Sequence, residues 1–236
     1  MNSQPCVVAI DGPAGSGKST VSRRLAMALD AKYLDTGAMY RAATWWCTRR
    51  GVPLDDRAAV AREAAALPLV LGLDPDAPTV TVAGVDVAAA IRTSEVSAAV
   101  SAVATNLDVR AELVARQRAL IATECAGGFS TGRGVVAEGR DITTVVAPDA
   151  TVRVLLTASA AARLARRARE VHGTDSARAV AATRDQVLRR DADDSTVVEF
   201  QTAADGVVTV DSTELDLPET IAAVLAVVHD IAEVRP

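Results

Sequence analysis

The segment CVVAIDGPAGSGKST covers residues 6–20 and contains the signal that decides the fold. Residues 6–10 form a short apolar run rich in valine and isoleucine, which is typical of a strand buried on both faces of a parallel sheet. Residues 12–19 match the pattern G-x-x-x-x-G-K-[ST], and a helical segment follows from Lys18. A strand, this loop and a helix in succession predict a loop whose backbone N–H groups and helix N-terminus bind phosphate.

Each residue type in the loop has a physical use. The glycines let the backbone approach a phosphate closely, the Lys18 side chain is expected to reach the β- and γ-phosphates of ATP, and the Ser19 hydroxyl is expected to ligate Mg²⁺. The alternative is a glycine-rich turn that only joins a strand to a helix, and the Lys-Ser pair disfavours it. The predicted ATP-binding residues are Gly12, Pro13, Ala14, Gly15, Ser16, Gly17, Lys18, Ser19 and Thr20.

Outward from this segment, short apolar runs alternate with long segments rich in alanine, arginine and leucine. This pattern predicts an α/β fold with a mostly parallel sheet. The predicted central strands are residues 6–10, 33–34, 134–137, 151–156 and 207–210. The predicted helices are residues 18–29, 38–50, 56–66, 96–124, 160–171, 177–190 and 219–232, the fourth of which is long enough to be broken. Turn signals at DPDAP and AGVD, within residues 67–90, predict a small antiparallel insert.

Composition excludes several classes of protein. With 236 residues, half of them hydrophobic, the chain predicts one globular domain rather than a disordered chain. A net charge of -5 and 3% aromatic residues argue against binding of nucleic acid. Three scattered cysteines disfavour a disulfide framework and a structural zinc site. No apolar run reaches the length of a membrane span or resembles a signal peptide, so we expect a cytoplasmic protein that binds small molecules and no membrane.

Other polar candidates lie where predicted strands end or helices begin. Arg41 is one turn into the helix that follows the second strand, although an arginine at such a place is often a solvated surface residue. Arg140 and Asp141 follow the strand at residues 134–137, and ligands of open α/β sheets bind beyond the carboxyl ends of strands. A strand-end salt bridge is the alternative for this pair. Arg190 and Asp194 have the spacing of an ordinary i,i+4 ion pair.

Four arginines gather on the predicted helix at residues 160–171. They are Arg163, Arg166, Arg167 and Arg169. A solvated basic face would explain them, but in a protein with a phosphate-binding loop they also suit a lid that closes over a transferring phosphoryl group.

The segments IDGPAGSGKST, YLDTGAMYR, IRTSEV, EGRDITTVVAPDA, RRDADDST and VTVDST together resemble the bacterial cytidylate kinases, from near the N-terminus to about Asp216. The resemblance implies a P-loop three-layer α/β sandwich with a five-stranded parallel central sheet. It also implies a single kinase domain over residues 1–236. Within this domain we expect a core at residues 1–62 and 103–236, a lid at about residues 159–176, and an inserted CMP-binding part at residues 63–102.

The same resemblance implies the activity and the roles of the candidate residues. The expected reaction is transfer of a phosphoryl group from ATP, with Mg²⁺, to CMP or dCMP, and the expected state is a monomer. The cytosine would be contacted by Ser101, Arg110 and Asp141, and the CMP phosphate would be held by Arg41 and Arg140. The ribose would lie by Arg190 and Asp194, in a pocket also lined by Thr36 and Tyr40. The transferring phosphoryl group would be stabilised by Lys18, Arg163 and Arg167.

The chain departs from the pattern of these kinases at a few positions near the expected acceptor site. Val197 stands where an arginine is usual, Phe200 lies where a Pro-Leu pair is common, and Thr143 and Ala147 replace a glycine and a phenylalanine. Two other functions therefore stay open: a kinase for UMP or AMP, and a protein that binds ATP but has lost its acceptor site.

Overall fold

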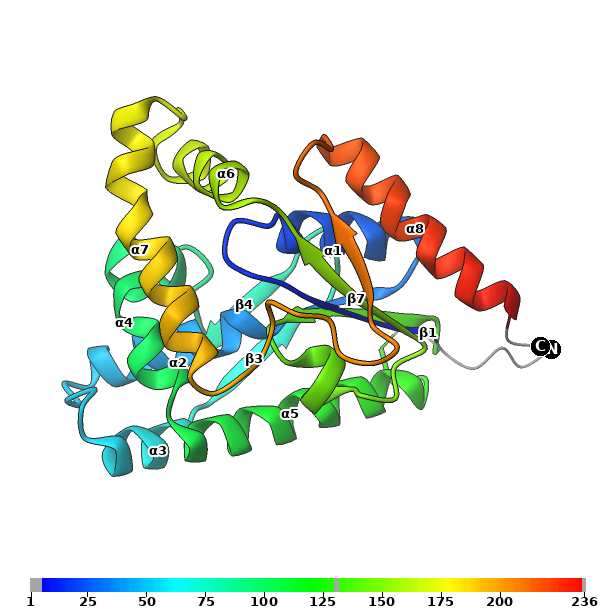
Figure 1. Ribbon diagram of the computed structural model, residues 1–236. Helices are drawn as coiled ribbons and strands as arrows, with labels where there is room; N and C mark the ends of the chain where they lie inside the picture. Colours follow the sequence, from blue (N-terminus) through cyan, green and yellow to red (C-terminus); the bar gives the residue numbers. More distant parts are fainter. Residues whose placement is uncertain (1–5, 130–131, 235–236) are drawn as a thin grey trace.

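A parallel five-stranded sheet forms the centre of the protein, in the order β2-β6-β1-β7-β8. The computed structural model describes residues 6–129 and 132–234 (Figure 1). The five strands are β1 (Cys6–Asp11), β2 (Lys32–Asp35), β6 (Gly134–Gly139), β7 (Val152–Thr157) and β8 (Val208–Asp211). Each coincides with a predicted apolar run, so the predicted α/β class and the parallel central sheet are confirmed.

Helices cover both faces of this sheet. They are α1 (Lys18–Ala28), α2 (Thr36–Arg49), α3 (Arg57–Ala65), α4 (Ser94–Ala104), α5 (Leu107–Cys125), α6 (Ala160–His172), α7 (Ala177–Ser195) and α8 (Leu217–Val234), with short turns η1 (Ala90–Arg92) and η2 (Ile142–Val146). α1 and α8 pack on one face through residues such as Leu25 and Val224. α2 and α5 pack on the other face through residues such as Met39 and Leu113. The result is a three-layer sandwich with two apolar cores.

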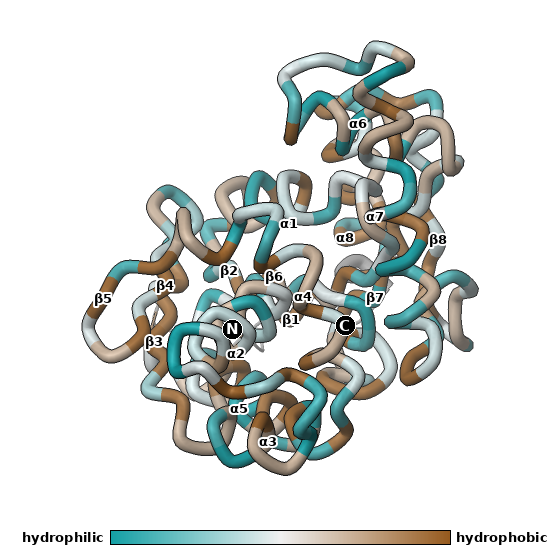
Figure 2. The backbone as a smooth tube through the Cα atoms, turned by 90° about the vertical axis from the view of Figure 1, so that its left-hand side faces the viewer, coloured by the Kyte–Doolittle hydropathy of each residue, from teal (hydrophilic) through white to brown (hydrophobic). Residues whose placement is uncertain are grey.

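The predicted antiparallel insert is a second sheet of three strands, β3 (Leu69–Gly72), β4 (Thr79–Val82) and β5 (Val85–Asp86). It adjoins the edge of the central sheet, where the Tyr33 N–H donates to the Leu73 carbonyl at 3.0 Å. Figure 2 shows this small sheet at one end of the molecule, with α6 and the adjoining part of α7 projecting at the other. Within the described residues, no helix combines the length and apolar character that crossing a bilayer requires.

Two helices differ from the sequence-based prediction in ways that affect the site. The segment predicted as one helix over residues 96–124 is broken into α4 and α5, because Asn106 accepts a hydrogen bond from the Asp108 N–H and starts a new helix. α7 continues to Ser195, five residues beyond the predicted end at residue 190. This extra turn carries Asp191 and Asp194 on a helix rather than in a loop.

The register of the strands brings several acidic residues to one edge of the sheet. Glu138 pairs with Ile10 on one side and with Asp35 on the other, and Asp11 is opposite Gly139. Because all these strands are parallel, their carboxyl ends lie together, next to the loop that begins at Gly12. The topology therefore places the phosphate-binding loop and the ends of β2 and β6 around one space.

Candidate active site

The site is a cavity of about 270 Å³ at this edge of the sheet. The P-loop and α1 form one wall, α2 and the end of β6 form the floor, and α4, α6 and α7 close the remaining sides. Of the residues predicted for the site, fifteen line the cavity: Ala14, Gly15, Gly17, Lys18, Ser19, Thr20, Thr36, Tyr40, Arg41, Arg110, Arg140, Asp141, Arg167, Arg190 and Asp194. Gly12, Pro13, Ser16, Ser101 and Arg163 are not among the lining residues of this cavity.

Lys18 begins α1 and its Nζ donates to the Pro13 carbonyl at 3.1 Å, so the side chain folds back over its own loop. Burial lowers the pKa of Lys18 to about 8, while the negative charge of Glu138 opposes this shift. A buried ammonium that has only a carbonyl as its hydrogen-bond partner is well suited to bind an anionic oxygen. Gly15, with φ +77°, lets the loop pass the backbone of α6 so closely that a Cβ here would lie 2.5 Å from the Arg163 carbonyl oxygen.

A second feature is the pair of carboxylates beside Ser19. The Ser19 Oγ donates to Glu138 Oε1 at 2.6 Å, and the Tyr33 hydroxyl donates to the same oxygen at 3.2 Å. Burial, together with the neighbouring Asp35, raises the pKa of Glu138. Burial also acts to raise the pKa of Asp35, but Arg41 and Arg92 outweigh it and hold that pKa below its usual value. A hydroxyl with two carboxylates is a set of hard oxygen donors that fits Mg²⁺.

The positive side of the cavity consists of arginines held by aspartates. Arg41 Nη2 lies 3.1 Å from Asp35 Oδ2, and Arg140 Nε lies 2.5 Å from Asp194 Oδ2. The predicted i,i+4 pair of Arg190 and Asp194 is present, but at 3.7 Å it is the longer of the two contacts to Asp194. Burial, reinforced by the charges of Arg140 and Arg41, lowers the pKa of Arg190 to about 10. The positive charges of these three arginines repel one another, and binding of a dianion between them would relieve that repulsion.

The part of the cavity around Arg110 and Asp141 has a different character. Arg110 Nη2 forms an ion pair with Asp141 Oδ2, and the Arg110 guanidinium lies over the Tyr40 ring at 5.9 Å from its centroid. Burial raises the pKa of Asp141 to about 6 against the opposing effect of Arg110. Val100 and Ala104 of α4 line this part of the cavity. A flat, partly apolar space with a fixed guanidinium and carboxylate suits a heterocyclic base.

Ser101 and Arg163 have other surroundings. Ser101 is on α4 between the two lining residues of that helix and is half-buried, and its carbonyl accepts a hydrogen bond from Thr105 Oγ1 at 2.8 Å. Arg163 Nη1 donates to the Ala14 carbonyl at 2.9 Å and to Asp191 Oδ2 at 2.5 Å. Arg167, one turn later on α6, lines the cavity and pairs with Glu170 at 2.8 Å.

The residues at which this chain departs from the pattern of the kinases it resembles lie close to the site. Thr143 uses its N–H and its hydroxyl to donate to the buried Asp11 carboxylate, at 2.8 and 2.6 Å, and burial raises the pKa of Asp11. Ala147 is buried in the core beneath this turn. Val197 lies beside a shallow hollow against α5 that Arg110 also lines. Phe200 is fully buried, and the Arg140 guanidinium lies 4.4 Å from its ring centroid.

Among the residues that sequence reasoning did not assign, the charged side chains of Asp35, Arg92 and Glu138 line the cavity, and Asp191 lies beside it. Asp35 and Glu138 had a visible signal, because each directly follows a predicted strand at the carboxyl edge of the sheet. For Arg92 and Asp191, the sequence showed only that each lies in a polar segment, which does not indicate a place at the site. Their positions depend on how distant elements pack.

Comparison with known proteins agrees with this geometry. A family model described as cytidylate kinase matches residues 8–230. A cytidylate kinase of Streptomyces avermitilis is 45% identical over 95% of this chain and 93% of its own. Those of Nocardia farcinica and Rhodococcus jostii are 49% and 48% identical, over 92% and 98% of this chain and 90% and 97% of their own. The chain therefore belongs to the cytidylate kinase family.

Proposed function

We propose that this protein transfers the γ-phosphoryl group of ATP to CMP or dCMP. The products are ADP together with CDP or dCDP, respectively. Family membership supports an ATP-dependent phosphotransferase. The observation that carries the proposal is that the P-loop, the arginines Arg41, Arg140 and Arg190, and the Arg110–Asp141 pair all line one cavity. The residues expected at the donor phosphates, the acceptor phosphate and the base therefore share one cavity, which supports the proposal.

In this reaction an oxygen of the CMP phosphate attacks the γ-phosphorus as the bond to the ADP oxygen breaks. The second pKa of a phosphate monoester is about 6, so the acceptor is already a dianion at neutral pH and needs no general base. Catalysis then depends on positioning and on neutralising negative charge. Lys18 acts at the donor phosphates, and Arg41, Arg140 and Arg190 hold the acceptor phosphate and the ribose next to it.

The ATP side includes Mg²⁺, which nucleotide kinases use with ATP. When bound, this ion neutralises charge on the β- and γ-phosphate oxygens. Ser19, with the carboxylates of Glu138 and Asp35, would hold it. The Ser19–Glu138 hydrogen bond fixes the hydroxyl at the end of β6, where such an ion would be needed.

The cytosine site would use Asp141 and Arg110. A carboxylate accepts from the exocyclic amino group of cytosine, and a guanidinium donates to its ring nitrogen or carbonyl oxygen. Uracil has the reverse pattern at two of these atoms, so the same fixed pair would leave polar groups unmatched. Residues 63–102 would enclose the monophosphate, and residues 159–176 would act as a lid, with Arg167 facing the transferring group and Arg163 locked to the P-loop.

The test is a coupled ADP-release assay with Mg-ATP, run in parallel with CMP, dCMP, UMP, AMP and no acceptor. We expect CMP and dCMP to give rates far above the others. A preference for UMP or AMP would assign a different acceptor. ATP binding without any acceptor-dependent turnover would show that the protein binds the nucleotide but has lost its acceptor function, with Val197, Thr143 and Ala147 as the candidate causes.

A further inference from the structure

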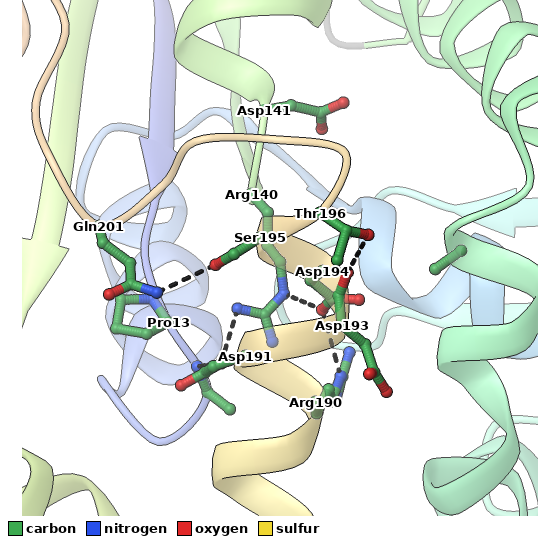
Figure 3. Close-up of polar contacts among 12 residues, drawn as sticks. Pro13, Arg140, Asp141, Arg190, Asp191, Asp193, Asp194, Ser195, Thr196 and Gln201 are labelled. Atoms are coloured by element: carbon green, nitrogen blue, oxygen red, sulfur yellow. Dashed lines mark hydrogen bonds and ion pairs between the residues drawn. The ribbon is translucent and has the colours of Figure 1, made fainter.

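A single carboxylate connects the donor loop, the lid helix and an acceptor arginine. Asp191 lies in the last part of α7 and is 6% exposed. Its Oδ1 accepts the Ala14 N–H at 3.0 Å and lies 3.1 Å from Arg140 Nη1. Its Oδ2 accepts from Arg163 Nη1 at 2.5 Å. Figure 3 shows Asp191 between the P-loop, seen at Pro13, and the Arg140 guanidinium.

These contacts fix α6 and the P-loop to one another. Arg163 donates from the same Nη1 to the Ala14 carbonyl at 2.9 Å, so Ala14 is held at both its N–H and its carbonyl. Gly15 next to it lies against the α6 backbone. The loop that would bind the donor phosphates therefore has its first half braced by α6 and α7 before any ligand arrives.

The same carboxylate limits the freedom of Arg140. This guanidinium lies between Asp191, Asp194 at 2.5 Å and the Phe200 ring at 4.4 Å, and the Arg140 side chain is 12% exposed. The contact with Asp191 is an ion pair without hydrogen-bond geometry, since the buried Arg140 Nη1 makes no hydrogen bond among the described residues. Two carboxylates and an aromatic face around a planar guanidinium restrict its orientation, and Arg140 also lines the cavity.

We propose that Asp191 is a positioning residue that sets the place of Arg140 relative to the P-loop, and with it the distance between the acceptor phosphate and the donor. This inference rests on the proposed phosphoryl transfer. The physical reason is that the transfer needs the attacking oxygen and the phosphorus in near-contact and in line, so a displacement of about 1 Å costs up to about 100-fold in rate. A carboxylate that touches both halves of the site can hold that distance. The Asp194 carboxylate, in contrast, pairs with Arg140 and Arg190, both proposed for the acceptor side.

Two substitutions separate positioning from charge balance. Asp191→Asn keeps one acceptor oxygen but turns an amide donor toward either Arg163 or Arg140, which are themselves donors. Asp191→Glu keeps the charge and moves the carboxylate outward by one methylene. Asp193→Asn and Asp193→Glu are the matched controls, because Asp193 is on the same turn of α7 and its carboxylate points away from Arg140 (Figure 3).

The measurement is the single-turnover rate constant, by rapid quench, with enzyme in excess over labelled ATP and with saturating CMP. As long as the folded enzyme remains saturating over ATP, this rate constant does not depend on the fraction of enzyme that is folded, and its independence of enzyme concentration is checked for each variant. We expect both Asp191 variants to transfer at least about tenfold more slowly than wild type, and both Asp193 variants to stay within twofold. Melting temperatures are recorded alongside.

The outcomes are distinct. Wild-type rate constants in both Asp191 variants would overturn the inference, and so would a slow Asp191→Asn with a normal Asp191→Glu, because charge balance alone would then explain the residue. If Asp191→Asn does not fold, the rate constant of Asp191→Glu decides alone: a loss of about tenfold or more supports the inference, and a wild-type value overturns it. If wild-type protein transfers nothing to CMP, the proposed function fails, and that result is visible before any variant is compared.

Discussion

At the scale of single residues, the buried ammonium of Lys18 is the clearest test of the donor site. Its pKa of about 8 reflects burial without a full set of partners, which a polyphosphate would supply. We expect Lys18→Ala to lower turnover by on the order of 10²–10³-fold or more. CMP binding, measured by isothermal titration, should change little because the residues proposed to hold CMP, Arg110 and Asp141 among them, do not include Lys18. The control is Lys32→Ala, which removes the other lysine of the chain. Retained turnover in Lys18→Ala would contradict the donor-site assignment.

Asp141 makes base selection sensitive to pH. Burial raises its pKa to about 6, so the carboxyl is charged above that pH and becomes protonated below it. Protonation removes the acceptor for the cytosine amino group and weakens the pair with Arg110. We expect the ratio of kcat/KM for CMP to that for UMP to fall as the pH drops from 7.5 through 6. The ratio cancels the titration of the acceptor phosphate, which is common to both nucleotides. A ratio that is flat in wild type, or equally steep in Asp141→Asn, would show that this carboxyl does not select the base.

The same carboxyl has the opposite effect on stability. A carboxyl whose pKa is raised in the folded protein binds its proton more tightly there than in the unfolded chain. Its contribution to stability is therefore fully present below its unfolded pKa of about 4 and is lost as the pH rises through about 6. Asp141 thus reduces stability at the pH where it would serve the reaction, which is usual for a residue retained for its chemistry.

Prediction from sequence named residues at the cavity where they are contiguous in the chain. Most of the P-loop segment lines the cavity, as do Arg140 and Asp141, which follow a strand end. Their roles in the reaction stay predictions. Asp191 could not be assigned in this way, because its partner Ala14 is 177 residues away in the chain. Phe200 was noticed only as a departure, and its contact with Arg140 depends on the path of the chain after α7. Such contacts are set by packing between elements, which no local pattern reports.

At the scale of elements, the break between α4 and α5 is what aims Arg110 at the cavity. Asn106 is 2% exposed; it caps α5 by accepting from the Asp108 N–H, and its Nδ2 donates to the Arg57 carbonyl at 2.8 Å. Periodicity predicted a helical segment over residues 96–124 that was long enough to be broken, but it did not locate the break. A buried cap that also joins α3 to α5 explains why two short helices replace one long one.

Removing this cap should destabilise the protein. We expect Asn106→Ala to lower the free energy of unfolding by about 1–3 kcal/mol, because it removes a cap and leaves the Arg57 carbonyl without that donor. Chemical denaturation measures the change. Ala102→Ser, at an exposed position of α4, is the control and should stay within about 0.5 kcal/mol of wild type. Equal stability of Asn106→Ala and wild type would show that another interaction positions the start of α5.

At the scale of the whole molecule, two side-chain ties supplement the Tyr33–Leu73 hydrogen bond between the part of the chain that carries the small sheet and the core. Arg23 of α1 donates from Nε to the Pro75 carbonyl at 2.6 Å and from Nη2 to the Asp76 carbonyl at 2.9 Å. Arg92 of η1 pairs with Asp35 at 3.1 Å, next to the acceptor arginine Arg41. The first tie joins the turn between β3 and β4 to the helix that starts at the P-loop. Since both ties end at elements that form the cavity, the placement of the small sheet and the shape of the acceptor site are coupled.

Arg23→Met tests the tie between α1 and the turn that joins β3 to β4. Methionine keeps much of the aliphatic part of the arginine side chain but removes both hydrogen-bond donors to Pro75 and Asp76. We expect faster hydrogen exchange in β3 and β4, a higher KM for CMP, and nearly unchanged affinity for an ATP analogue, because the Ser19 and Lys18 contacts do not involve Arg23. Arg24→Met is the matched control, because the Arg24 guanidinium, on the next residue of α1, donates to Met27 Sδ at 3.9 Å within its own helix. If exchange in the small sheet is the same in both variants, the Arg92–Asp35 pair and the Tyr33–Leu73 hydrogen bond suffice to hold it. If exchange rises while the KM for CMP stays at the wild-type value, the small sheet moves independently of the acceptor site, and the proposed role of residues 63–102 in enclosing the monophosphate is wrong.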